Sequence, residues 1–142
     1  MREAIYPGTF DPITLGHFSV VERGLKVFDR IHIACNVGSS GKQPYFPIEK
    51  RIEMLEAVFA DHENVVIEPF DGLFANYVAN KGVFTVLRGI RTVEDFEYEH
   101  RMQSINQQLN KKIETVFLLT ENSYAHLASS LLRELIRLGA SV

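Results

Sequence analysis

The segment Tyr6-Pro-Gly-Thr-Phe-Asp-Pro-Ile-Thr-Leu-Gly-His17 directly follows a short β-rich run at residues 3–6. Its prolines and first glycine predict a rigid turn whose backbone a ligand can approach closely. Its last residues, Gly16 and His17, lie where helical periodicity begins, and a helix N-terminus favours phosphate through free N–H groups and its dipole. His17 adds a hydrogen bond to phosphoryl oxygens. Taken alone, the segment also fits a tight turn without a ligand.

Strand-like and helix-like runs alternate outward from this segment. We expect strands at 3–6, 30–37, 64–68, 84–87 and 115–119, and helices at 16–28, 47–59, 73–80, 93–109 and 129–138. This alternation predicts an α/β fold, a single Rossmann-like, doubly wound domain over residues 1–142 with a five-stranded parallel sheet. Such sheets bind ligands beyond the carboxyl ends of their strands, at a topological switch point.

Length and composition narrow the class of protein. The 142 residues fit one domain, and the net charge of −3 argues against a nucleic-acid partner while permitting a local basic pocket. The sequence carries neither a leader pattern nor a long apolar run, so we expect no membrane span. Cys35 is the one cysteine, which excludes an internal disulfide and predicts a reducing, cytoplasmic location.

A second motif, Arg88-Gly89-Ile90-Arg91, follows the fourth expected strand. Arginine holds phosphate oxygens through a planar set of donors. A solvated basic turn is the alternative for an isolated match. The position at a strand end favours a phosphate-binding role.

A third motif lies on the helix expected at 93–109. Asp95, Glu99, Met102 and Asn106 share one helical stripe. Carboxylates, a thioether and an amide form an unusual core face, and a carboxylate here can accept from ribose hydroxyls or orient the arginines. A solvated charged face is the alternative.

Two weaker signals complete the candidate site. Lys42 lies in a loop rich in glycine and serine, where a lone lysine is usually only solvent-exposed. Ser129 and Ser130 begin the last expected helix, where they either cap it or present hydroxyls to a triphosphate. The histidines other than His17 have no zinc-ligand spacing, so no metal site built from side chains is expected.

Together, and in this order, the motifs resemble bacterial phosphopantetheine adenylyltransferases, and the resemblance covers essentially the whole chain. The first motif alone marks only the wider nucleotidyltransferase superfamily. The resemblance implies that ATP and 4'-phosphopantetheine give 3'-dephospho-coenzyme A and pyrophosphate, the penultimate step of coenzyme A synthesis. It also implies Mg²⁺ held mainly by phosphates, a homohexamer and feedback inhibition by coenzyme A.

The resemblance also implies roles for individual residues, with His17 stabilising the transition state at the α-phosphate. The residues implied to contact ATP are Thr9, Phe10, His17, Gly89, Ile90, Arg91, Glu99, Tyr124, Ala125, His126, Leu127, Ala128, Ser129 and Ser130. Those implied to contact phosphopantetheine are Thr9, Lys42, Phe74, Arg88, Met102 and Asn106. This sequence departs from the family pattern in two places. Ala128 stands at a position where family members often have serine. The chain stops at Val142, where family members usually continue through a short helical segment.

Two other functions remain open at this point. One is a nucleotidyltransferase of the same fold with another phosphate acceptor, which the Lys42 loop and the segment 95–99 argue against. The other is a non-catalytic module that senses ATP or coenzyme A. A sensor needs no arrangement for two phosphate substrates, so it is disfavoured by the intact set of Thr9, His17, Lys42, Arg88 and Arg91.

Overall fold

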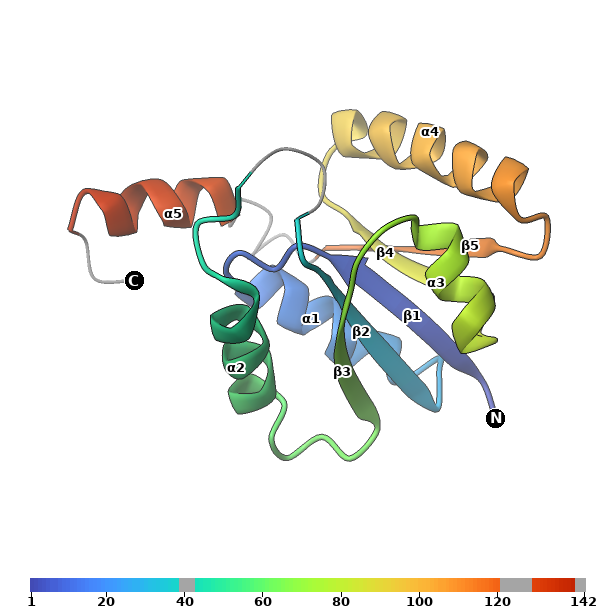
Figure 1. The fold of residues 1–142 in the computed structure, drawn as a ribbon, viewed down its shortest axis with the longest axis horizontal. Coiled ribbons are helices and arrows are strands. Elements are labelled where there is room, and N and C mark those ends of the chain that lie inside the picture. The colour runs from blue at the N-terminus through green and yellow to red at the C-terminus, as the bar shows by residue number, and fades with distance from the viewer. Residues whose placement is uncertain (39–42, 121–128, 140–142) are drawn as a thin grey trace.

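The computed structural model describes residues 1–38, 43–120 and 129–139. Strands and helices alternate through the chain (Figure 1). They are β1 (Glu3–Gly8), α1 (Leu15–Gly24), β2 (Arg30–Asn36), α2 (Ile48–Val58), β3 (Val65–Phe70), α3 (Phe74–Lys81), β4 (Thr85–Ile90), α4 (Val93–Leu109), β5 (Glu114–Leu119) and α5 (Ser129–Arg137). No helix among these residues is both long enough and apolar enough to cross a membrane.

The five strands form one parallel sheet in the order β3-β2-β1-β4-β5. The chain therefore builds outward from β1 to β3, then crosses to the other side of β1 and builds outward again through β4 to β5. This order confirms the predicted doubly wound sheet. It places the topological switch point between the carboxyl ends of β1 and β4, where such folds bind ligands.

Helices cover both faces of the sheet, α1 and α2 on one and α3 and α4 on the other (Figure 1). Because successive strand residues point to opposite faces, Ala4 of β1 packs in the core beneath α1 and α2, while Ile5 packs beneath α3. The two cores fix the helices on the sheet, and thereby fix the loops that surround its carboxyl edge.

Most boundaries differ from the sequence-based expectation by one or two residues, and three of the differences bear on the site. β1 continues through Pro7 and Gly8, which pair in register with β2 and so end the strand rather than form the turn. β4 continues through Arg88 to Ile90 because its pairing with β5 continues there. Helix α1 ends at Gly24, and the N–H groups of Val27 and Phe28 both donate to the Gly24 carbonyl in a closing turn.

Candidate active site

Two adjacent pockets open at the carboxyl ends of β1 and β4. The first, here called the turn pocket, lies between the β1–α1 turn, β4 and the start of α5. The second, here called the α4 pocket, lies between the ends of β1 and β4 and helices α3 and α4. Thr9 and Arg88 line both pockets and form a common wall. The site can therefore hold two ligands that meet at these residues.

His17 is held in one orientation and one tautomer by the first turn of α1. The N–H of Thr14 donates to His17 Nδ1 at 3.0 Å, and the N–H of His17 donates to Thr14 Oγ1 at 3.1 Å. This reciprocal capping box satisfies two N–H groups at the helix start. Because Nδ1 accepts a hydrogen bond, the neutral ring carries its proton on Nε2.

The surroundings of His17 keep its ring neutral. Burial of the ring, followed by the positive charges of Arg88 and Arg91, lowers its pKa from 6.5 to about 4. The Phe10 ring packs edge-on against it, with centroids 4.9 Å apart. At neutral pH, His17 is therefore an uncharged, fixed hydrogen-bond donor in the turn pocket.

Arg88 is fixed by a two-point ion pair with Glu99. Its Nε donates to Glu99 Oε2 at 2.8 Å and its Nη2 to Oε1 at 2.6 Å, while Nη1 donates to the Pro7 carbonyl. The sequence left two roles open for the carboxylates of α4, and Glu99 takes the second of them by orienting an arginine. Its implied contact with ATP stays a prediction.

Arg91 is paired with Asp95 through a longer ion pair than the one between Arg88 and Glu99. Its Nε lies 3.5 Å from Asp95 Oδ2, and its backbone N–H donates to the same oxygen at 3.2 Å. Between the two arginines, Gly89 allows α1 to approach β4, since a Cβ there would lie 2.8 Å from Val20 Cγ2. Arg88 and Arg91 thus line the turn pocket on one side, opposite the β1–α1 turn.

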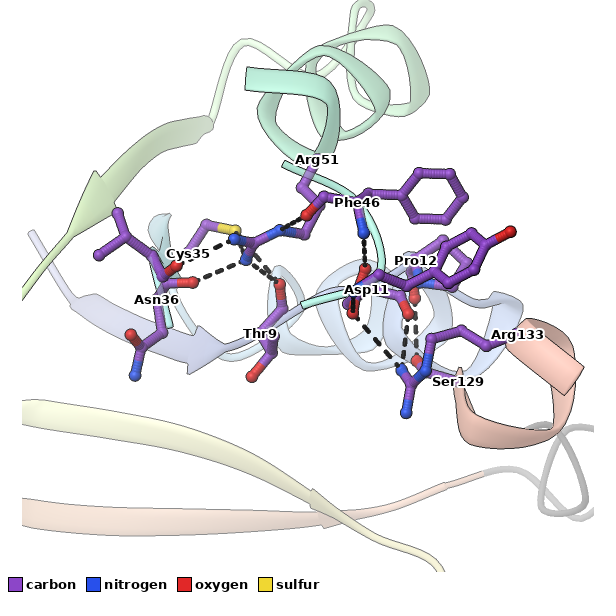
Figure 2. Close-up of polar contacts among 11 residues, drawn as sticks. Thr9, Asp11, Pro12, Cys35, Asn36, Phe46, Arg51, Ser129 and Arg133 are labelled. Carbon is purple, nitrogen blue, oxygen red and sulfur yellow. Dashed lines mark hydrogen bonds and ion pairs between the residues drawn. The ribbon is translucent and has the colours of Figure 1, made fainter. Parts of the chain in front are cut away.

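Helix α5 is bonded to the β1–α1 turn (Figure 2), and its first residues line the turn pocket. Ser129 Oγ donates to the Pro12 carbonyl at 2.9 Å, and Arg133 Nη1 donates to the Asp11 carbonyl at 2.6 Å. Ser129 and Ser130 line the pocket, and their contact with a triphosphate stays a prediction. The Ser129 hydroxyl also anchors α5 to the turn, which the sequence did not indicate.

The α4 pocket is a more apolar hollow. Phe74 of α3 lines it together with Met102 and Asn106 of α4, and so do Thr9 and Arg88. The structure therefore brings together the described residues that were expected to contact phosphopantetheine. Of the predicted stripe on α4, Glu99, Met102 and Asn106 line this pocket, whereas Asp95 lines the turn pocket.

Comparison with known proteins agrees with this geometry. The model of the cytidylyltransferase-like family matches residues 5–135. The phosphopantetheine adenylyltransferase of Nitratidesulfovibrio vulgaris (strain DP4) is 41% identical over 139 residues, which are 98% of this chain and 74% of that protein. The enzyme of the same name from Caldanaerobacter subterraneus subsp. tengcongensis is 42% identical over 139 residues, 98% of this chain and 86% of its own length.

The chain belongs to the phosphopantetheine adenylyltransferase family. Two solved structures with the same fold share less of their sequence with this chain. A bifunctional NMN adenylyltransferase/ADP ribose pyrophosphatase from Francisella tularensis has a TM-score of 0.74 at 16% identity, covering 99% of this chain and 44% of that one. A lipopolysaccharide core biosynthesis protein from Thermoplasma volcanium GSS1 has a TM-score of 0.61 at 20% identity, covering 86% of this chain and 99% of that one. These two likenesses concern the fold alone.

Some implied contacts of this family member lie outside the described residues. These are Lys42 and the run Tyr124, Ala125, His126, Leu127 and Ala128. Ile90 is described, but it is buried and lines neither pocket. The roles of these residues stay predictions.

Sequence reasoning missed three residues that shape the site of this adenylyltransferase-family chain. Asp11 is buried, and its carboxylate accepts the N–H groups of Tyr45 and Phe46 at 2.7 and 2.8 Å. Arg133 of α5 donates to the Asp11 carbonyl from the other side of the turn pocket. Arg51 is almost completely buried, and its signal was an arginine on the otherwise apolar stripe of α2.

Proposed function

We propose that this chain transfers the adenylyl group of ATP to 4'-phosphopantetheine, giving 3'-dephospho-coenzyme A and pyrophosphate in coenzyme A biosynthesis. The observation that carries the proposal is the common wall of two pockets. Thr9 and Arg88 separate a turn pocket lined by phosphate-binding groups from a more apolar pocket suited to a pantetheine arm. The family membership supports the same pair of substrates.

The reaction requires no covalent intermediate on the protein. An oxygen of the acceptor phosphate forms a bond to the α-phosphorus of ATP while the bond from that phosphorus to the bridging oxygen of pyrophosphate breaks. The protein acts by positioning both phosphates in line and by stabilising developing charge. His17 suits this role because a neutral Nε2–H donates to an α-phosphate oxygen without a proton transfer.

The cationic residues divide between the two substrates. Arg88 lies at the common wall, where its guanidinium is fixed before ligands arrive, and we assign it to the acceptor phosphate together with Lys42. Arg91, Ser129 and Ser130 line the turn pocket alone and suit the phosphates of ATP.

Magnesium fits this site as a companion of the nucleotide. Among residues 1–38, 43–120 and 129–139, no cluster of three His, Cys, Asp or Glu side chains is placed to hold a metal ion. The turn-pocket carboxylates of Asp11, Asp95 and Glu99 each lie within 4.0 Å of an arginine. We therefore propose that ATP phosphates hold most of the coordination of Mg²⁺, whose chemical contribution is to neutralise their charge.

Assembly and regulation follow from the resemblance as further proposals. Coenzyme A combines an adenosine part and a pantetheine part, so it suits both pockets as a feedback inhibitor.

Apolar side chains exposed on α4, among them Phe96, Ile105 and Leu109, support a homohexamer whose subunits bury them. Sedimentation of the purified chain tests the hexamer. The cytoplasmic location stays a prediction.

Pyrophosphate release tests the proposed function. We expect release with ATP, Mg²⁺ and 4'-phosphopantetheine, and none above background when nicotinamide mononucleotide replaces the acceptor. Release with nicotinamide mononucleotide alone would favour another acceptor. ATP binding without release in either case would favour a non-catalytic sensor.

A further inference from the structure

Arg51, in the first turns of α2, ties together three segments that are distant in sequence (Figure 2). Its Nε donates to the Phe46 carbonyl at 2.9 Å, and its Nη1 donates to the carbonyls of Thr9 at 2.8 Å and Asn36 at 2.6 Å. Its Nη2 donates to the Val37 carbonyl at 3.3 Å. The segments that meet here are the end of β2, the approach to α2 and the β1–α1 turn.

The positive charge of Arg51 is buried without an acidic partner in the described part of the chain. Its side chain is 1% exposed, and no ion pair between described residues includes it. Burying an arginine charge is costly unless its donors are satisfied, and here carbonyl oxygens satisfy them. The charge is thus retained directly behind the β1–α1 turn, where it adds to the positive potential felt by an anion in front of the turn.

The bond to Thr9 also fixes the direction of the next amide. Asp11-Pro12 is the one cis peptide bond among the described residues, so the Thr9–Phe10 peptide is trans. In a trans peptide the carbonyl and the following N–H point in opposite directions. With the Thr9 carbonyl directed at Arg51, the N–H of Phe10 points away from Arg51. Figure 2 shows the Thr9 carbonyl directed at the Arg51 guanidinium. The Thr9 hydroxyl points away from that guanidinium.

Phe10 has a strained backbone, which the contacts around it must maintain. Its φ of 49° lies in the left-handed region, which a bulky residue rarely adopts unless its surroundings enforce it. Phe10 is 3% exposed and lines the turn pocket. No hydrogen bond between described residues uses its N–H as donor.

We infer that Arg51 is a positioning residue that holds the Thr9–Phe10 peptide so that the Phe10 N–H faces a phosphate oxygen in the turn pocket. The inference rests on the proposed function for the identity of that phosphate, which is part of ATP. Arginine suits this role better than lysine because its planar set of donors reaches several fixed carbonyls at once, whereas the lysine ammonium is a compact charge on a flexible stem.

Steady-state kinetics of Arg51→Lys test the inference, with Leu55→Ala as the matched control. Leu55 lies one turn further along the same helix and is fully buried in the core, and its side chain has no polar group to hold a carbonyl. Assayed well below both melting temperatures, Arg51→Lys should lower kcat/KM for ATP at least tenfold, while Leu55→Ala should change it less than threefold. Equal effects of the two changes at equal stability would overturn the inference.

Chemical rescue separates the guanidinium from general packing. In Arg51→Ala, added guanidinium ion should restore part of the lost turnover, whereas urea, which is similar in shape but neutral, should not. Equal recovery with urea, or no recovery in a folded and ATP-binding variant, would contradict the role of the charged group.

An NMR measurement begins with the wild-type chain, so its first outcome does not depend on any variant folding. Adding α,β-methylene-ATP to ¹⁵N-labelled protein should shift the Phe10 amide resonance strongly, and Arg51→Lys should reduce that shift. An unmoved Phe10 amide in a wild-type protein saturated with the analogue would overturn the inference. An enzyme inactive toward 4'-phosphopantetheine would instead refute the proposed function, while the Phe10 amide would still report on Arg51.

Discussion

Glu99 binds Arg88 through two parallel hydrogen bonds, from Nε to Oε2 at 2.8 Å and from Nη2 to Oε1 at 2.6 Å. The Pro7 carbonyl accepts from the third nitrogen, so α4 and β1 together fix the guanidinium at the common wall. Fixing a charged group in advance reduces the entropy lost when a phosphate binds. We therefore expect Glu99 to affect substrate binding through the arginine that it orients.

Glu99→Gln should weaken the acceptor site. The amide keeps the size of the side chain but removes one acceptor oxygen and the charge that balances Arg88. We expect KM for 4'-phosphopantetheine to rise by about tenfold, and the free energy of unfolding to fall by about 1–3 kcal/mol. Glu97→Gln, on the exposed side of the same helix, is the matched control. An unchanged KM in Glu99→Gln would show that Arg88 needs no such partner.

His17→Ala should remove most turnover while ATP still binds. The lost group is a preorganised donor to charge that develops in the transition state, and such a loss costs about 10²–10³ in kcat. Calorimetric titration with ATP should give a Kd within about threefold of the wild-type value, because ground-state binding uses the other groups of the pocket. His100→Ala, at an exposed position of α4, serves as control. Near-normal kcat in His17→Ala would refute the assigned role.

The lowered pKa of His17 predicts a specific pH dependence. Above its folded pKa of about 4 the ring is neutral, so turnover should show no step near 6.5, the ordinary pKa of histidine. In the unfolded chain the ring binds a proton near pH 6.5, whereas the folded chain resists it until about pH 4. The contribution of His17 to stability is therefore full above pH 6.5 and is lost as the pH falls toward 4.

Ring ¹⁵N shifts of His17 followed by NMR against pH check this prediction directly. They should report a neutral ring with the proton on Nε2 at pH 6, and a midpoint near pH 4. A midpoint near 6.5, or a proton on Nδ1, would contradict the hydrogen bond from the Thr14 N–H.

Thr14→Val should separate helix capping from catalysis. Losing the N-cap hydroxyl costs about 1 kcal/mol of stability and also releases one side of the His17 capping box, so kcat should fall. Thr92 caps α4 in the same way, accepting from the Asp95 N–H at 3.1 Å. Thr92→Val should therefore cost similar stability, measured by urea unfolding, with kcat retained. A parallel loss of kcat in both variants would show that capping alone explains the effect.

The sequence predicted each strand and helix because hydrophobic periodicity and glycine or proline boundaries are local signals. The helix Val93–Leu109 is confirmed to the residue. Strand ends were less predictable. β4 includes Arg88 and Gly89 because Arg88 pairs in register with Phe117 of β5, and pairing of this kind depends on a strand that follows much later in the chain.

The candidate site was predictable where motifs follow strands. Thr9 and Arg88 come together because the carboxyl ends of parallel strands meet at one edge of the sheet. The position of Arg51 on the apolar stripe of α2 indicated burial, but its carbonyl partners were not predictable, because they belong to segments distant in sequence. The choice between a ribose contact and an arginine partner for Glu99 likewise depended on the distance between α4 and β4.

The common wall formed by Thr9 and Arg88 has a consequence for drug resistance. A compound that contacts both residues would touch groups on which two substrates depend together. A substitution there that excludes the compound would also impair each substrate, so escape by a single mutation would carry a growth penalty. Compounds confined to the far end of the α4 pocket, near Phe74 or Asn106, would leave a less costly route to resistance.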